Sequence, residues 1–231
     1  MKHLTVIQHT APEWLGHLED HFEGRGIRFG YHRPFANGGV LPSVQTLGDG
    51  LVLVGGGDFG AATPGHLLPT LDAEVRLVRA CLMLEKPVLA LGLGAQILSL
   101  AADGKVDPAP LRLTAEQVTR RSPAALGGLM PEAFPLVAYL RDAPVLPAYA
   151  TLLAADKTGG PAAFQIGRNA FGFAGHIGVR RAMIEELVMD ADPPVEDAAT
   201  RLEDIGRLGP AIEDALVPLM AGLLRAWEFG G

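Results

Sequence analysis

The sequence predicts an α/β fold with a mainly parallel central sheet, and three features of the chain support this. Short apolar runs alternate with amphipathic segments through residues 1–105, which is the order of βαβ units. These runs are apolar throughout, as expected for strands that helices cover on both faces. After residue 105, short strands follow one another closely with Pro and Gly between them, and they indicate an added antiparallel section.

Local patterns predict the individual elements. The parallel section is expected to hold strands at 4–9, 27–33, 50–57 and 87–92, and helices over 11–26, from about 70 and over 94–103. In the first of these helices Trp14, Leu15, Leu18 and Phe22 share one face. The strands of the added antiparallel or mixed section are expected at 111–118, 135–140, 150–156, 162–167 and 170–175. Three helices should follow, over 180–190, 194–208 and 210–229, with a kink at Pro218.

Composition excludes several classes of function. The chain has 231 residues and a formal net charge of −7, with its basic residues scattered, so a duplex-binding surface is not expected. No apolar run is long enough to span a membrane, and the N-terminus lacks the apolar core of a secretory signal. The single cysteine, Cys81, allows no internal disulfide, which suits a cytoplasmic protein. The chain shows no cofactor-binding motif, and we expect no cofactor.

The strand–corner–helix segment over residues 86–106 is the most informative part of the chain. Its apolar strand runs into Gly92, and an apolar helix follows at once. Such a corner holds its tip residue in a strained conformation beside the positive end of the helix, where nucleophiles are often placed. A glycine at the tip tolerates this conformation but carries no nucleophile. On these grounds the corner could be either a simple tight turn or a residual anion-binding site.

Residues 87–106, PVLALGLGAQILSLAADGKV, resemble the nucleophile elbow of class I glutamine amidotransferase domains. In that family the segment contains P-V-L-G-I-C-L-G-A-Q, so Gly92 stands where the resemblance places the catalytic cysteine. Leu93, Gly94, Ala95 and Gln96 match the four residues that follow it. The resemblance implies that Leu93 and Gln96 lie at the ligand-binding, oxyanion-like part of the site.

Further segments resemble the same family in the same order. Residues 50–60 resemble its glycine turn, which implies that Gly56 or Gly57 supplies an N–H to the oxyanion hole. Residues 170–187 place His176 at the catalytic histidine and Gly178 at the glutamate that orients it. Residues 138–156 resemble a third family segment. Within it Tyr139, Asp142, Leu146, Pro147 and Leu153 align, but Leu140 replaces a histidine.

The resemblance implies a flavodoxin-like three-layer sandwich. Residues 1–190 would form the amidotransferase-like domain, and residues 191–231 a helical extension packed on it. Because the family's cysteine attacks the glutamine amide and its histidine needs the orienting glutamate, Gly92 and Gly178 imply that glutaminase activity is lost. The expected role is a binding or regulatory module, associated with a synthetase-type partner of the kind such domains serve.

Two alternatives stay open. The chain could be an active amidotransferase or γ-glutamyl hydrolase, in which His176 activates a water in place of the thiolate. It could also sense a small carboxylate, amide or phosphate held at the emptied elbow. Oligomeric state is open too, since the apolar C-terminal helix could cap the core or form a homodimer surface.

The remaining candidates have plainer interpretations. Cys81 is expected to be a buried structural thiol, and Ser99 to face away from the corner. His66, Asp58 and Asp142 could converge at the mouth of the elbow, although solvated loop residues are more common there. His17 and His21 are spaced as zinc ligands can be on a helix, but a third ligand is lacking, so we expect no metal site.

Overall fold

The computed structural model describes residues 1–192 and 194–229, and its centre is a nine-stranded sheet in the order β2-β1-β3-β4-β11-β10-β9-β6-β7. The first five strands in this order run parallel to one another. They are β2 (Arg28–His32), β1 (His3–Gln8), β3 (Gly50–Val54), β4 (Val88–Leu91) and β11 (Ala170–Phe173). The predicted mainly parallel α/β core is therefore confirmed.

The second part of the sheet is antiparallel, as the change of pattern after residue 105 predicts. It consists of β10 (Pro161–Ile166), β9 (Thr151–Ala155), β6 (Arg112–Arg120) and β7 (Ala133–Leu140). The exception is β11, the last strand expected in this section, which pairs parallel with β4 and antiparallel only with β10. The short strands β5 (Lys105–Asp107) and β8 (Ala143–Val145) form a separate two-stranded ladder. A single 3-10 turn, η1 (Ala125–Gly128), lies between β6 and β7.

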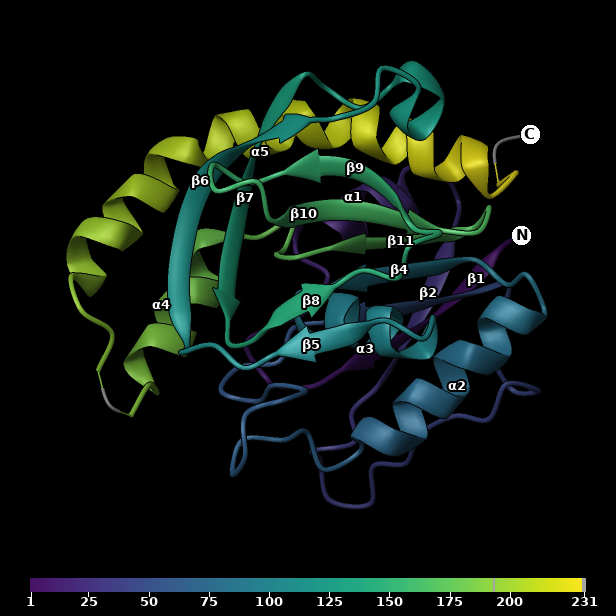
Figure 1. Cartoon of the computed structure of the whole chain (residues 1–231), viewed down its shortest axis with the longest axis horizontal. Coiled ribbons are helices and arrows are strands. Elements are labelled where there is room, and N and C mark those ends of the chain that lie inside the picture. Colours follow the sequence, from purple (N-terminus) through teal and green to yellow (C-terminus); the bar gives the residue numbers. More distant parts are fainter. Residues whose placement is uncertain (193, 230–231) are drawn as a thin grey trace.

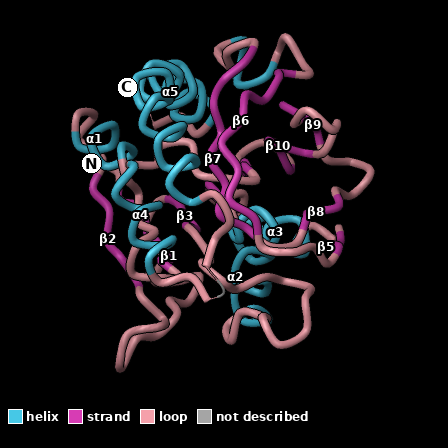
Figure 2. Tube along the Cα trace, turned by 90° about the vertical axis from the view of Figure 1, so that its left-hand side faces the viewer, coloured by secondary structure: helices cyan, strands magenta, loops and turns pink. Residues whose placement is uncertain are grey.

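Helices cover both faces of the sheet and make three layers (Figures 1 and 2). The helices α1 (His17–Glu23) and α5 (Ala198–Ala226) pack on one face, and α4 (Arg181–Met189) lies beside them. On the other face are α2 (Leu71–Met83) and α3 (Leu93–Ala101). Successive residues of a strand point to opposite faces, so Val52 faces α1 and α5 while Leu51 and Leu53 face α2 and α3.

The first helix is shorter than predicted. It begins at His17 and not near residue 11, because Gly16 adopts φ +62° and interrupts the turn before it. Glu13 and Trp14 consequently lie in a loop between β1 and α1. This change matters for the site, because it lets the Glu13 side chain turn into the protein.

The last two predicted helices form a single continuous helix. Helix α5 continues from Ala198 to Ala226 with Pro210 and Pro218 inside it, and Figure 1 shows it arching along one side of the molecule. Each proline removes one backbone hydrogen bond, which is the reason for expecting a break or a kink. Burial of Leu216, Leu219 and Leu223 against the sheet offsets that loss. In the part of the chain that the structure describes, no helix combines the length and apolarity needed to cross a bilayer.

Candidate functional site

The elbow has the geometry that the sequence predicts. Strand β4 ends at Leu91, Gly92 turns the chain with φ +60° and ψ −119°, and α3 begins at Leu93. The Gly92 N–H donates to the carbonyl of Phe173, 3.0 Å away, which ties the corner to β11. A Cβ added at Gly92 would lie no closer than 3.8 Å to any atom outside the adjoining chain. The corner therefore has room for a side chain, and only its backbone conformation favours glycine.

The glycine turn that follows β3 holds a carboxyl group of the chain itself. Oε2 of Glu13 accepts N–H bonds from Gly56 at 2.7 Å and from Gly57 at 2.6 Å. It also accepts the Thr10 hydroxyl at 2.9 Å. The Glu13 side chain is buried, and this burial raises its pKa above the ordinary value. The N–H groups that the resemblance assigns to an oxyanion hole are thus already bonded.

Glu13 is a site residue that the sequence analysis did not identify. The sequence predicts a helix at this position, where a glutamate is ordinarily solvated. The available signal was its position in the segment after the first strand, since loops at the carboxyl ends of parallel strands meet at one edge of the sheet. Glycine is required at position 56 because Leu93 packs closely against it. A Cβ at Gly56 would lie 2.6 Å from Cβ of Leu93, so no larger residue fits. The Leu93 side chain is fully buried there.

His176 lies beside the elbow, but both of its ring nitrogens are occupied by backbone groups. Nε2 donates to the carbonyl of Trp14 at 2.7 Å, and Nδ1 accepts the N–H of Gly178 at 3.1 Å. Burial lowers the pKa of His176 to about 4, so the imidazole is neutral near pH 7. No lone pair remains for taking a proton from a thiol or a water in this arrangement.

Gly178 lies where any side chain would be crowded by two helices. A Cβ at this position would be 3.0 Å from Cγ of Leu18 and 3.4 Å from Cδ2 of Leu216. The Gly178 carbonyl accepts the N–H of His17 at 2.8 Å. Residues Leu18 and Leu216 therefore crowd the position that the resemblance gives to the glutamate.

Gly92, His176 and Glu13 line a shared cavity of only about 10 Å³. A cavity of this size holds one water molecule at most. Leu140, which replaces a family histidine, is buried in the apolar core on the α3 side of the sheet. The structure thus brings Gly92 and His176 to the same cavity, but this cavity is too small for a substrate.

Two other predicted polar residues hold loops together. Gln96 is fully buried; its Nε2 donates to the Arg141 carbonyl at 2.6 Å and its Oε1 accepts the Ala61 N–H at 3.2 Å. Asp142 accepts backbone N–H groups from Ala61, Ala62 and Thr63 at 2.8–3.1 Å, and the Thr63 hydroxyl. Burial alone would raise the pKa of Asp142, but these hydrogen bonds outweigh it and lower the pKa.

The predicted cluster of His66, Asp58 and Asp142 is not brought together as a set. Asp58 accepts the Tyr139 hydroxyl at 3.0 Å, while His66 is exposed and contributes backbone contacts to the same loop. Within residues 1–192 and 194–229, no group of three or more His, Cys, Asp or Glu side chains could hold a metal ion. This includes the surroundings of His17 and His21.

Cys81 and Ser99 are buried away from the elbow. Burial raises the pKa of the Cys81 thiol to about 11, so it is protonated at neutral pH. The Ser99 hydroxyl donates to the carbonyl of Val145 at 2.9 Å. Their contacts are those of structural residues.

A buried ion pair supports the strand end next to the glycine turn. Nε2 of His9 lies 2.7 Å from Oε2 of Glu74, and Nδ1 of His9 lies 2.8 Å from the Val54 carbonyl. Burial is the largest effect and disfavours the imidazolium, but the Glu74 carboxylate and the Val54 carbonyl together outweigh it and raise the pKa of His9. No local sequence pattern indicates this pair, because the two residues come from different elements.

Solved structures of glutamine amidotransferases share this fold over nearly the whole chain. One from Methylobacillus flagellatus is 23% identical with a TM-score of 0.83, covering 98% of this chain and 95% of its own. One from Thermotoga maritima is 24% identical with a TM-score of 0.82 and 98% coverage of both chains. A putative GMP synthase subunit from Thermoplasma acidophilum has a TM-score of 0.55 at 18% identity, covering 81% and 92%. No protein-family model matches the sequence, and no curated protein matches it significantly.

The fold and the corner define the structural class. The chain has the class I glutamine amidotransferase fold, as the sequence resemblance predicts. At these identities the likeness establishes the fold alone.

Proposed function

We propose that this chain is an amidotransferase-like binding or regulatory module that has lost glutaminase activity. The observation that carries the proposal is the Glu13 carboxyl, which occupies the N–H groups of Gly56 and Gly57 beside an elbow without a nucleophile. Residues 1–190 would form the amidotransferase-like domain and residues 191–231 its helical extension. The single buried Cys81 suits a reducing compartment such as the cytoplasm.

Amide hydrolysis at such an elbow requires a nucleophile, a base and donors for the developing oxyanion. Gly92 offers no nucleophile, and His176 has no free ring nitrogen in this arrangement. Loss of one oxyanion donor costs about 10²–10³ in kcat in known hydrolases. These deficits act on the same step, which supports loss of activity and not a change of specificity.

A water activated by His176 has little support. With a pKa of about 4, the imidazole would be a weak base at neutral pH, and the cavity leaves no room for an amide substrate. The same small volume argues against a carboxylate or phosphate sensor at the elbow itself.

The proposed partner is a synthetase-type protein. Support comes from the fold shared with the putative GMP synthase subunit of Thermoplasma acidophilum, which is named as one part of an enzyme. A module without glutaminase activity could still occupy the docking position of an active amidotransferase.

Glutamate release by the purified wild-type chain tests the proposal. We expect no release above the uncatalysed rate from glutamine or from a panel of γ-glutamyl amides. An active class I amidotransferase at equal concentration serves as the positive control. Robust turnover by the wild-type chain, abolished in His176→Ala, would refute the proposal and establish the water-activated alternative.

A further inference from the structure

The glycine turn after β3 has the geometry of a site for a carboxyl group. The N–H groups of Gly56 and Gly57 converge on one oxygen atom, at 2.7 and 2.6 Å, and Gly57 has a φ of +52°. Successive N–H groups that converge in this way form a concave anion-binding site. The Thr10 hydroxyl donates to the same oxygen at 2.9 Å, so three donors surround it. In this structure the oxygen is Oε2 of Glu13.

The backbone of the turn is shaped around this occupant. A Cβ at Gly55, whose φ is +75°, would lie 2.4 Å from Cβ of Glu13. A Cβ at Gly57 would lie 2.8 Å from Cγ2 of Thr10. Glycine at both positions therefore lets the segment 10–14 lie directly against the turn. Because the acceptor and the third donor both belong to this segment, its displacement would uncover the N–H groups of the turn together.

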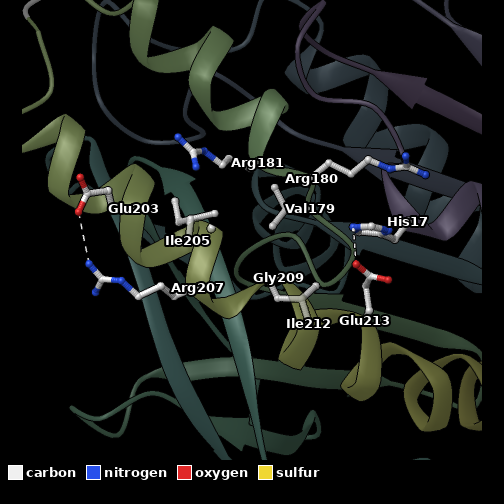
Figure 3. A pocket seen from close by; sticks show the side chains of 11 residues that line it. His17, Val179, Arg180, Arg181, Glu203, Ile205, Arg207, Gly209, Ile212 and Glu213 are labelled. Carbon is white, nitrogen blue, oxygen red and sulfur yellow. Dashed lines mark hydrogen bonds and ion pairs between the residues drawn. The ribbon is translucent and has the colours of Figure 1, made fainter.

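The residue next to Glu13 fastens this segment from outside. The Arg180 guanidinium lies over the ring of Trp14, 5.3 Å from its centroid, and Nη2 of Arg180 bonds Asp20 at 2.6 Å. Figure 3 shows Arg180 and Arg181 extending in opposite directions from the start of α4, so only Arg180 reaches this segment. Contacts of this kind at the surface contribute modestly, and they can be broken without unfolding a chain.

We propose that the glycine turn is a carboxyl-binding site that the chain keeps closed with its own Glu13, and that Trp14 under Arg180 is the latch. The ligand class follows from the occupant, since a small carboxylic acid reproduces the group that Glu13 places there. While the latch is closed the site takes no free ligand, in keeping with the cavity of about 10 Å³ beside Gly92. A Cβ at Gly92 would lie 3.8 Å from the Gly55 carbonyl oxygen, so a bound acid would lie next to the elbow.

This closure rests on the proposed function, since it explains how an elbow without a nucleophile is kept closed, but the two can fail separately. The proposed function is tested by glutamate release. The closure is tested by ligand binding and by amide hydrogen exchange, and neither of these measurements requires turnover.

Removal of the Glu13 side chain should open the site to a free acid. Glu13→Ala leaves space for formate, and Glu13→Gly, which also lacks Cβ, leaves space for acetate. Each matched acid should shift the backbone amide resonances of Gly56 and Gly57 saturably, with a Kd on the order of 10 mM. It should also raise the thermal midpoint above that in equal chloride. The wild type and Glu13→Gln, in which an acceptor still fills the turn, should show neither effect.

Weakening the latch should expose the turn in a chain that keeps Glu13. Arg180→Gln removes the cation over Trp14, and we expect hydrogen exchange at the amides of the glycine turn to become about threefold faster or more. Arg181→Gln is the matched control, because it removes the adjacent arginine, which pairs with Glu185 at 2.7 Å instead. This control should leave exchange at the same amides unchanged.

Every outcome of these measurements bears on the proposal. If Glu13→Ala is unfolded in chloride, formate should restore its folded fraction, as measured by circular dichroism. The proposal is overturned if formate neither binds to this variant nor refolds it, or if the acids act equally on the wild type. It is also overturned if the glycine amides of Arg180→Gln exchange no faster than those of Arg181→Gln.

Discussion

Glu74→Ala should lower the free energy of unfolding by about 3–5 kcal/mol below pH 6.5, because it leaves the imidazolium of His9 buried without its counter-charge. The side chains of His9 and Glu74 are 1% and 0% exposed, so water cannot replace the lost partner. The Thr70 hydroxyl also loses its acceptor, Oε1 of Glu74. Urea denaturation followed by circular dichroism measures the effect.

The pair of His9 and Glu74 should also make the free energy of unfolding depend on pH. The folded-state pKa of His9 is raised above 6.5, so its stabilising contribution is complete below pH 6.5 and declines as pH rises through the folded pKa. Glu74→Gln keeps the shape but removes the charge, and it should flatten this decline. Asp103→Asn, which removes an exposed acid paired with Arg79, is the control and should change stability by about 0.5 kcal/mol or less. If Glu74→Ala lowered the free energy of unfolding by no more than Asp103→Asn does, the account would be contradicted.

Glu13→Ala should cost about 3 kcal/mol of unfolding free energy, since it leaves the buried N–H groups of Gly56 and Gly57 without an acceptor. Glu13→Gln retains a carbonyl oxygen that can accept the same bonds, and it should cost much less at neutral pH. Equal losses for the two variants would show that the glycine turn does not depend on this acceptor.

The sign of the Glu13 pH effect follows from its raised pKa. Protonated Glu13 is favoured in the folded chain, so its contribution is complete below the ordinary pKa of 4.5 and is lost as pH rises through the folded value. Glu13→Gln does not lose stability in this way as the pH rises, because glutamine does not titrate. Its stability relative to the wild type should therefore increase with pH above 4.5, as measured by urea denaturation across a pH series.

The sequence was sufficient for the fold because its strongest signals are local. The apolar runs that form β1, β3 and β4 indicated the parallel section, and the segment around Gly92 identified the elbow. Helix boundaries were less predictable where tertiary packing decided them. Helix α1 begins later than predicted because Gly16 has a positive φ. Helix α5 continues past Pro210 because its apolar residues are buried against the sheet.

The polar contacts around the elbow could not be predicted for a different reason. Glu13 meets Gly56 and Gly57 across 43 and 44 residues of chain, and His9 meets Glu74 across 65. A local pattern gives no register for such pairs. The resemblance placed Gly56, Gly92 and His176 near one another, but it gave no indication that a carboxyl group would occupy the glycine turn.

Glutamine hydrolysis by Gly92→Cys tests the central claim most directly. A Cβ fits at residue 92, and the protonated Cys81 gives little background in a thiol titration, so formation of the new thiol can be verified independently. Gly92→Ala is the matched control for the backbone change. Because Glu13 occupies the N–H groups, His176 lacks a free nitrogen and Gly178 orients nothing, we expect no glutamate release above Gly92→Ala. Substantial glutaminase activity in Gly92→Cys would contradict the account and show that the cysteine alone was missing.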